Sequence, residues 1–244
     1  MILKLSTFVF KRVSKDLVSI AILFVTPLVL ITILGTIADG AMNETLGIPQ
    51  ADAVALSMIM AFQLFAGFYT LELMKYDLLQ DRKWRMMALP IPMHRYMYSI
   101  LIVTILFGGL QSFALTHYTR LMYDVTWGSQ LRLIGAILII SAAMQTMYLN
   151  IALFIKSFKT MERVAVSISF GSMLLGGVWF QLPDHAVLNF LGTYGNPYSL
   201  GENLLLGGMR GQWNIEGILT GIILILFTVM MIAISADKGR RMYR

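Results

Sequence analysis

The sequence predicts an all-α fold class: an integral membrane bundle of six transmembrane helices that forms a single domain over residues 1–244. Hydrophobic residues make up 57% of the chain and charged residues only 13%, whereas about a quarter of a soluble domain is charged. A helix needs about 20 mostly apolar residues to cross a bilayer core. Six continuous runs are close to this length, at about 17–38, 53–74, 96–118, 131–155, 164–182 and 215–236.

The sequence excludes a barrel architecture and several classes of function. Barrel strands would alternate in polarity over about ten residues, and these runs are longer and continuous. The chain has no cysteine, which excludes disulfides, cysteine-based zinc sites and thiol catalysis. The net charge of +6 does not indicate a nucleic-acid partner, because the basic residues flank apolar runs instead of sharing one face. The first sixteen residues do not read as a signal peptide, because their charges are interspersed with apolar residues and no small-residue cleavage site follows the next apolar run.

Residues 1–16 have the periodicity of an amphipathic helix. Ile2, Leu5, Val9 and Val13 fall on one face, and lysines fall on another. This pattern predicts an interfacial helix lying on the inner leaflet. The alternative is an ordinary basic flank that only sets topology.

Flanking charges predict the orientation of the bundle. Of the 19 Lys and Arg residues, sixteen lie before the first run or after the second, fourth and sixth runs. Such residues concentrate on the cytoplasmic side of membrane proteins. We therefore expect a multi-pass protein of a bacterial cell membrane, with both termini and the loop 75–95 in the cytoplasm.

The loop 75–95 concentrates charge in an otherwise apolar chain. Asp77, Asp81 and Arg85 recur every four residues, so they share one face of a helix. Trp84 adds apolar surface, and the prolines at 90 and 92 end any helix. A short, partly amphipathic helix of this kind suits docking to a cytoplasmic partner. The alternative is a solvated loop that only sets topology.

The outer segment 183–214 is too apolar for a free loop and too short to span again. It predicts two re-entrant or interfacial helices that cap the outer end of the bundle. The break is expected at Gly195, Asn196 and Pro197. A flexible loop is the alternative.

Polar and small residues inside the runs have two interpretations each. Gln63, Gln111 and Gln145 are candidates to line a substrate path, or to form helix-to-helix hydrogen bonds. Gly217 and Gly221 form a GxxxG pattern that favours packing with a second chain, and such spacing also arises by chance. No metal site, catalytic motif or nucleotide-binding loop is present in the sequence.

The order of these features resembles the permease subunits of type-2 ABC exporters. Six spans follow an N-terminal interfacial helix, and the stretch Asp81-Arg82-Lys83 leads to Leu89-Pro90 before the third span. Aspartate stands where the family more often has glutamate, and the family's glycine after the basic residue is absent. Near the other end, LPDHAVLNFLGTYGNPYSLGENLL matches the family's order, with Pro183, Asn196 and Pro197. The resemblance covers nearly the whole chain.

The resemblance implies an exporter without its own nucleotide site. Two copies of a cytoplasmic ATPase would carry Mg-ATP, and a second permease chain, identical or homologous, would complete the transporter. The outer segment would form an outer gate at Pro183, Asn196 and Pro197. The substrate would be amphipathic or lipid-like, such as a drug or antimicrobial peptide. The loop would supply the ATPase-coupling residues Asp77, Asp81, Arg82, Lys83, Trp84, Arg85 and Met87.

Two rival functions come from other classes. A membrane enzyme acting on lipids would need clustered acids, bases or metal ligands at one membrane face, which the sequence does not contain. An ATP-independent sensor or immunity protein would bind a toxin and move nothing. An ATPase partner separates the transporter from the sensor.

Overall fold

The structure is a computed structural model of the chain, and it describes residues 2–38, 40–44, 46–78, 80, 84, 88, 91–180, 183–209 and 215–241. Nearly all of this part is helical, which confirms the all-α class, and a small antiparallel hairpin accompanies the helices. The helices are α1 (Ile2–Val13), α2 (Leu17–Ile37), α3 (Gln50–Leu78), α5 (Met93–Tyr123), α6 (Gln130–Phe154), α7 (Phe158–Leu175), α8 (Ala186–Thr193), α9 (Pro197–Met209) and α10 (Ile215–Arg241), and the strands are β1 (Met42–Asn43) and β2 (Ile48–Pro49).

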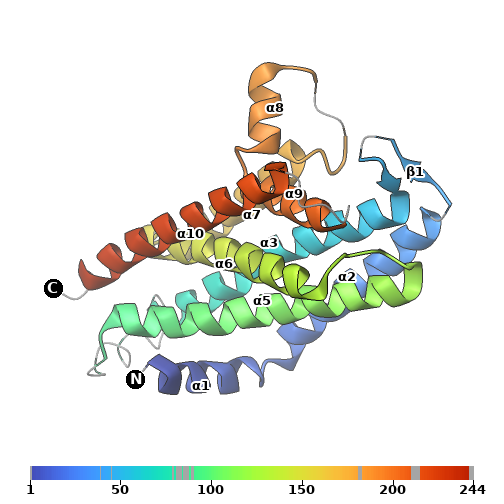
Figure 1. The fold of residues 1–244 in the computed structure, drawn as a ribbon. Coiled ribbons are helices and arrows are strands. Elements are labelled where there is room, and N and C mark those ends of the chain that lie inside the picture. Colours follow the sequence, from blue (N-terminus) through green and yellow to red (C-terminus); the bar gives the residue numbers. More distant parts are fainter. Residues whose placement is uncertain are drawn as a thin grey trace.

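The long helices form an elongated bundle whose two ends differ (Figure 1). The N- and C-termini lie at one end, and the hairpin β1–β2 lies at the other. Helix α8 projects away from the bundle beside α9. Helices α3, α5 and α6 contact one another, while α2 packs on α3 and α5 and α10 packs on α6 and α9.

Local chemistry explains where several helices begin and end. The Asp16 carboxylate accepts a hydrogen bond from the Ser19 amide at 3.3 Å and caps α2. Helix α5 begins directly after Pro92, which lacks the amide hydrogen that a preceding helix would need. It ends where Asp124 adopts a left-handed conformation, with φ of 52°. The turn then buries Trp127, whose indole donates to the Thr119 hydroxyl at 3.0 Å.

Close packing in the core depends on glycines that face large side chains. A Cβ on Gly67 of α3 would lie 2.0 Å from the ring of Tyr148, which is fully buried on α6. A Cβ on Gly201 of α9 would lie 2.4 Å from the methyl group of Met60. Neither position leaves room for a larger residue, so these glycines let α6 and α9 approach α3.

Five of the described helices, α2, α3, α5, α6 and α10, are long and apolar enough to cross a membrane. They correspond to five of the six predicted spans and indicate a multi-pass membrane protein. Helices α3 and α5 extend beyond the predicted runs at both ends, because helical packing continues past the apolar residues. The hairpin was not predicted, since each of its strands has only two residues.

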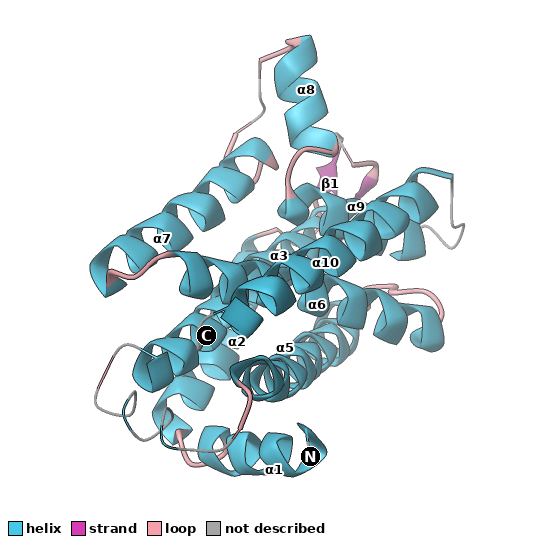
Figure 2. Ribbon diagram, turned by 90° about the vertical axis from the view of Figure 1, so that its left-hand side faces the viewer, coloured by secondary structure: helices cyan, strands magenta, loops and turns pink. Residues whose placement is uncertain are grey.

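The predicted span 164–182 is not among these five helices. Its first part belongs to α7, which begins earlier, at Phe158, and ends at Leu175. Charged residues in its first two turns lower its hydropathy, namely Lys159, Glu162 and Arg163. Figure 2 views α5 nearly along its axis, whereas α7 runs across the view. Helix α7 therefore differs from those five helices in composition and runs in a different direction from α5.

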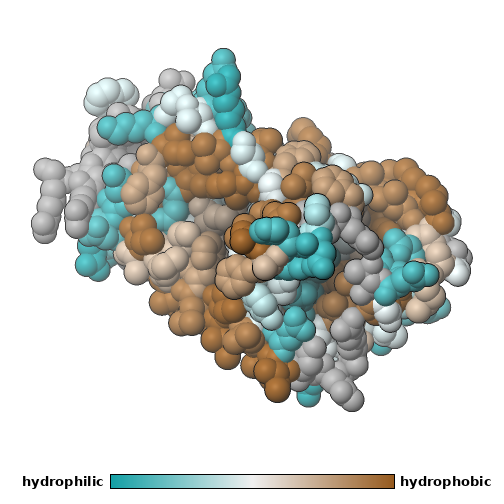
Figure 3. Space-filling view, turned by 90° about the horizontal axis from the view of Figure 1, so that it is seen from above, coloured by the Kyte–Doolittle hydropathy of each residue, from teal (hydrophilic) through white to brown (hydrophobic). Residues whose placement is uncertain are grey.

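The outer flank of the bundle is apolar. Only 17% of α2 and 22% of α10 is buried over their most apolar windows, compared with 61 to 78% for α3, α5 and α6. In Figure 3 broad hydrophobic areas cover much of the visible face, interrupted by separate groups of hydrophilic side chains. Such a surface suits contact with lipid chains or with another apolar helix.

Candidate functional site

A large cavity lies at the end of the bundle that carries the hairpin. Its volume is about 810 Å³, which is in the range of small-ligand pockets. Three regions contribute to its wall: the hairpin with the neighbouring ends of α2 and α3, the turn after α7, and α8 with α9. The lining residues are Leu34, Asn43, Leu46, Gln50, Ala53, Val54, Ser57, Met58, Leu175, Gly176, Gly177, Val178, Trp179, Phe180, Asn189, Gly192, Thr193 and Glu202.

Glu202 on α9 is the ionisable side chain in this described wall. Ser57 of α3 and Tyr198 of α9 each donate a hydroxyl hydrogen bond to its Oε1 at 3.4 Å. Burial raises the pKa of Glu202 to about 7, because a charged carboxylate loses hydration there, and the two hydroxyl donors oppose that rise. Desolvation therefore favours the protonated form of this carboxylate more than water does.

A tight turn after α7 places two aromatic side chains in the wall. Gly177 takes φ of 71°, which favours glycine, and its amide donates to the Leu174 carbonyl at 3.1 Å. The next amide, of Val178, donates to the Met173 carbonyl at 3.2 Å and completes a Schellman motif. The chain then presents Trp179 and Phe180 to the cavity.

The cap of α9 explains the predicted break in the outer segment. The segment folds as two helices, α8 and α9, separated at residues 194–196. Asn196 accepts from the Ser199 amide at 2.9 Å and donates to the Leu191 carbonyl at 3.0 Å. Pro197 follows as the first helical residue, where a missing amide hydrogen costs nothing.

Helices α8 and α9 were both expected to cap the outer end of the bundle, but they differ in burial. Much of α9 is buried in the bundle, where it contacts α3, α6, α7 and α10. No residue of α8 is buried. Asn196 is buried, whereas Pro183 is exposed before α8, so these outer-gate candidates differ in their surroundings.

The three glutamines lie away from the cavity and connect helices. Gln63 of α3 donates to the Gly108 carbonyl of α5 at 2.8 Å, and Gln145 of α6 accepts from the Thr70 hydroxyl of α3. Gln111 of α5 donates to a carbonyl of α2 at 2.7 Å. These contacts match the helix-to-helix interpretation of the glutamines. None of the three lines the described cavity.

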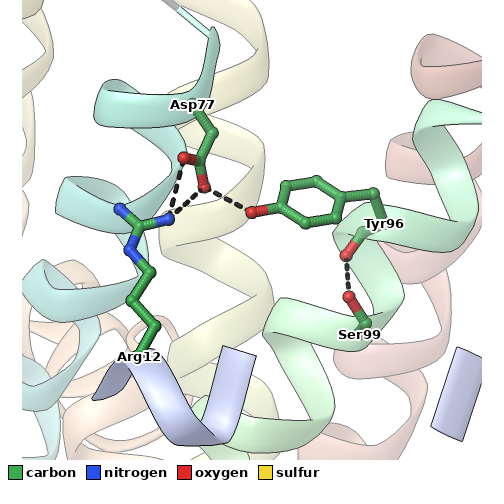
Figure 4. A network of polar contacts seen from close by, with 4 residues as sticks. All are labelled: Arg12, Asp77, Tyr96 and Ser99. Atoms are coloured by element: carbon green, nitrogen blue, oxygen red, sulfur yellow. Dashed lines mark hydrogen bonds and ion pairs between the residues drawn. The ribbon is translucent and has the colours of Figure 1, made fainter. Parts of the chain in front are cut away.

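A second polar network lies at the end of the bundle that holds the termini (Figure 4). Asp77, in the last turn of α3, is buried and accepts from the guanidinium of Arg12 at 2.7 and 2.8 Å. The hydroxyl of Tyr96, in the first turn of α5, donates to the same carboxylate at 2.5 Å. One side chain therefore joins α1, α3 and α5.

This placement changes the interpretation of Asp77. The sequence assigned it to a docking helix, but its carboxylate is buried inside the chain instead of facing a partner. Trp84 of the same predicted helix is 75% exposed. The other predicted coupling residues lie outside the described part of the chain, namely Asp81, Arg82, Lys83, Arg85 and Met87.

The GxxxG residues of α10 face the chain's own interior. Gly217 and Gly221 are both buried, and a Cβ on Gly221 would lie 3.2 Å from Leu204 of α9. The close helix contact at this motif is therefore an intramolecular one, between α10 and α9.

Sequence reasoning missed the residues that line the cavity. Glu202 is a carboxylate within the apolar stretch LGENLLLGG, and this mismatch is a usable signal. Trp179 and Phe180 follow a Gly-Gly pair, which indicates a turn. Only folding brings Ser57 to Glu202, because the two residues are 145 positions apart in the chain.

No protein-family model matches the sequence, and no curated protein matches it. The resemblance to type-2 ABC permeases therefore rests on the order and spacing of its motifs. Within the described residues, no group of three or more His, Asp or Glu side chains is placed to hold a metal ion.

Proposed function

We propose that the chain is the membrane-spanning permease subunit of an ATP-driven ABC exporter. It would move an amphipathic or lipid-like substrate out of the cell or out of the inner leaflet. The cavity of about 810 Å³ is the observation that carries this proposal. It combines apolar walls with a few polar groups, as substrate pockets do.

The proposal includes six spans, with α7 and the turn after it as the fifth, and both termini in the cytoplasm. The basic residues of α1, of the start of α7 and of the end of α10 support this orientation, because these segments share the end that holds the termini (Figure 1). The cavity would then open toward the outside. Helix α1 would lie at the inner interface, and α8 and α9 would form the outer re-entrant segment.

Coupling to a motor would use the polar network around Asp77. Residues 79–92 connect α3 to α5, and a partner pressing on that segment would act on both helices. The Arg12–Asp77–Tyr96 network ties those helices to α1. Closure of two ATPase subunits, which would carry Mg-ATP, would thereby move three helices together.

A second permease chain, identical or homologous, would complete the transporter. The exposed apolar faces of α2 and α10 support a partner helix or lipid there, because few of their side chains are covered within the chain.

Co-expression with the products of neighbouring genes tests the proposal. We expect purification in mild detergent to yield a complex of two permease chains and two ABC-type ATPase subunits. Inside-out vesicles should accumulate an amphipathic dye with ATP, and not when the ATPase carries a substitution in its phosphate-binding lysine. A chain that purifies without any ATPase, or vesicles that accumulate dye equally with both ATPases, would remove the proposal. The first result would favour a sensor that only binds.

A further inference from the structure

The cavity has one charge-bearing group and no compensating cation in its described wall. Its 18 lining residues include Glu202 and contain no Lys, Arg or His. A carboxylate held in a partly apolar site is stabilised by a positive charge placed beside it. The wall therefore favours a cation over an anion.

Aromatic side chains strengthen the same preference. Trp179 and Phe180 enter the wall together, and the Trp179 ring stacks on Phe170 of α7 at a centroid distance of 5.7 Å. Ring faces attract cations, with Trp the strongest of the three aromatic types. Leu34, Leu46 and Met58 add apolar surface that would favour hydrocarbon substituents on the same ligand.

The size of the cavity limits the ligand to one drug-sized molecule. A volume of about 810 Å³ lies within the usual range for such ligands. Two hydroxyl donors already bond to the Glu202 carboxylate, so a single extra positive charge completes its surroundings. A folded cationic peptide would not be enclosed.

We propose that this cavity binds lipophilic organic monocations, with Glu202 as the counter-ion and Trp179 as an aromatic wall. Binding is a property of this chain alone. That the bound cation is the exported cargo rests on the proposed transport function.

Two probes of matched shape and opposite charge test the inference. Tetraphenylphosphonium and tetraphenylborate are both four phenyl rings around one central atom. Binding of each labelled ion would be measured on the purified chain in phosphatidylcholine nanodiscs, without ATPase or nucleotide, and empty nanodiscs would be subtracted. We expect saturable binding of the phosphonium cation and no saturable binding of the borate anion.

Substitutions locate the binding site. Glu202→Gln keeps the size of the side chain and is expected to weaken phosphonium binding at least about tenfold, as the loss of a desolvated charge partner does. Glu216→Gln removes the same charge from an exposed position outside the cavity wall, and binding should not change. Trp179→Ala should weaken binding about three- to tenfold. Equal affinity in the wild type and Glu202→Gln, or saturable borate binding to the wild type, would overturn the inference.

The pH dependence provides an independent check. Because the pKa of Glu202 is about 7, roughly a tenth of the carboxylate is ionised at pH 6 and nine tenths at pH 8. Tyr198 contacts it, and burial raises the pKa of that hydroxyl well above 10, so Tyr198 stays neutral over this range. Phosphonium affinity should rise roughly tenfold from pH 6 to pH 8 in the wild type. A rise of equal size in Glu202→Gln would count against the assignment.

Failure of this inference and failure of the transport proposal have separate readouts. Absent phosphonium binding with intact ATP-driven dye uptake would reject the substrate class and keep the exporter. Phosphonium binding without any ATPase partner would keep the site and reject the exporter.

Discussion

Arg12 and Asp77 are 65 positions apart in the chain, yet their side chains form an ion pair at one end of the bundle. The Asp77 side chain is 2% exposed and that of Arg12 is 28% exposed, so the two charges are unequally buried. A buried carboxylate without a partner costs several kcal/mol. Both Arg12 and the Tyr96 hydroxyl offset that cost, and the pair therefore fixes α1 against the helical bundle.

Unequal burial predicts unequal effects of removing each partner. Arg12→Gln leaves the buried carboxylate without its cation and should destabilise the fold by about 3 kcal/mol. Asp77→Asn leaves a partly exposed guanidinium and should cost about 1 to 2 kcal/mol. The double variant should be more stable than Arg12→Gln alone. Thermal unfolding in detergent, followed by size-exclusion chromatography, measures all three variants.

Lys11→Gln is the control for that experiment, because it removes the same charge from an exposed neighbour on α1. We expect it to change stability by less than about 0.5 kcal/mol. Simple additivity of the two losses in the double variant would show that Arg12 and Asp77 are not energetically coupled.

Whole elements were more predictable than the contacts between them. Continuous apolar runs indicated α2, α3, α5, α6 and α10, because a helix that crosses a membrane must be apolar over a fixed length. The Asn-Pro pair likewise indicated the start of α9, since its chemistry is local. The burial of α9 and the exposure of α8 were not predictable, because both depend on which helices meet in three dimensions.

The candidate site shows the same limit. Its wall combines the hairpin, the turn after α7 and two helices of the outer segment, so no single stretch of sequence describes it. Asp77 shows the reverse error. Its spacing from Asp81 and Arg85 suggested a shared helical face, but α3 continues to Leu78 and carries Asp77 inward to Arg12. Periodicity specifies a face of a helix without specifying what that face contacts.

The segment after α3 has its own prediction. If the segment that follows Asp77, up to residue 89, contacts an ATPase, Asp81→Lys, Arg85→Glu and Trp84→Ala should each reduce ATP-driven transport about tenfold, as loss of an interface hot spot does. Insertion and folding should persist, because Trp84 is exposed. Arg120→Glu, exposed at the far end of α5, is the control and should leave transport unchanged. Vesicle uptake and ATPase co-purification measure the effects, and normal values for all three variants would exclude this contact.

At the scale of the whole molecule, the two ends of the bundle have different chemistry. One end holds both termini, the Arg12–Asp77 network and many basic side chains. The other holds the hairpin, and the cavity with Glu202 lies beside that hairpin. An apolar flank joins them (Figure 3). This difference between the two ends is the basis on which the proposed exporter would place its motor contact at one end and its substrate site at the other.

Cysteine labelling tests this orientation directly, because the chain contains no cysteine. Cysteines at exposed positions Glu44, near the hairpin, and Val187, on α8, should react with a membrane-impermeant maleimide added to intact cells. Cysteines at exposed positions Lys11 and Lys159 should react only after the membrane is opened, because basic flanks stay in the cytoplasm. The Lys159 result also decides whether α7 begins on the inner side, as its proposed place as the fifth span requires. Labelling of Lys11 and Lys159 positions in intact cells, with protection at Glu44 and Val187, would reverse the orientation and place the cavity on the cytoplasmic side.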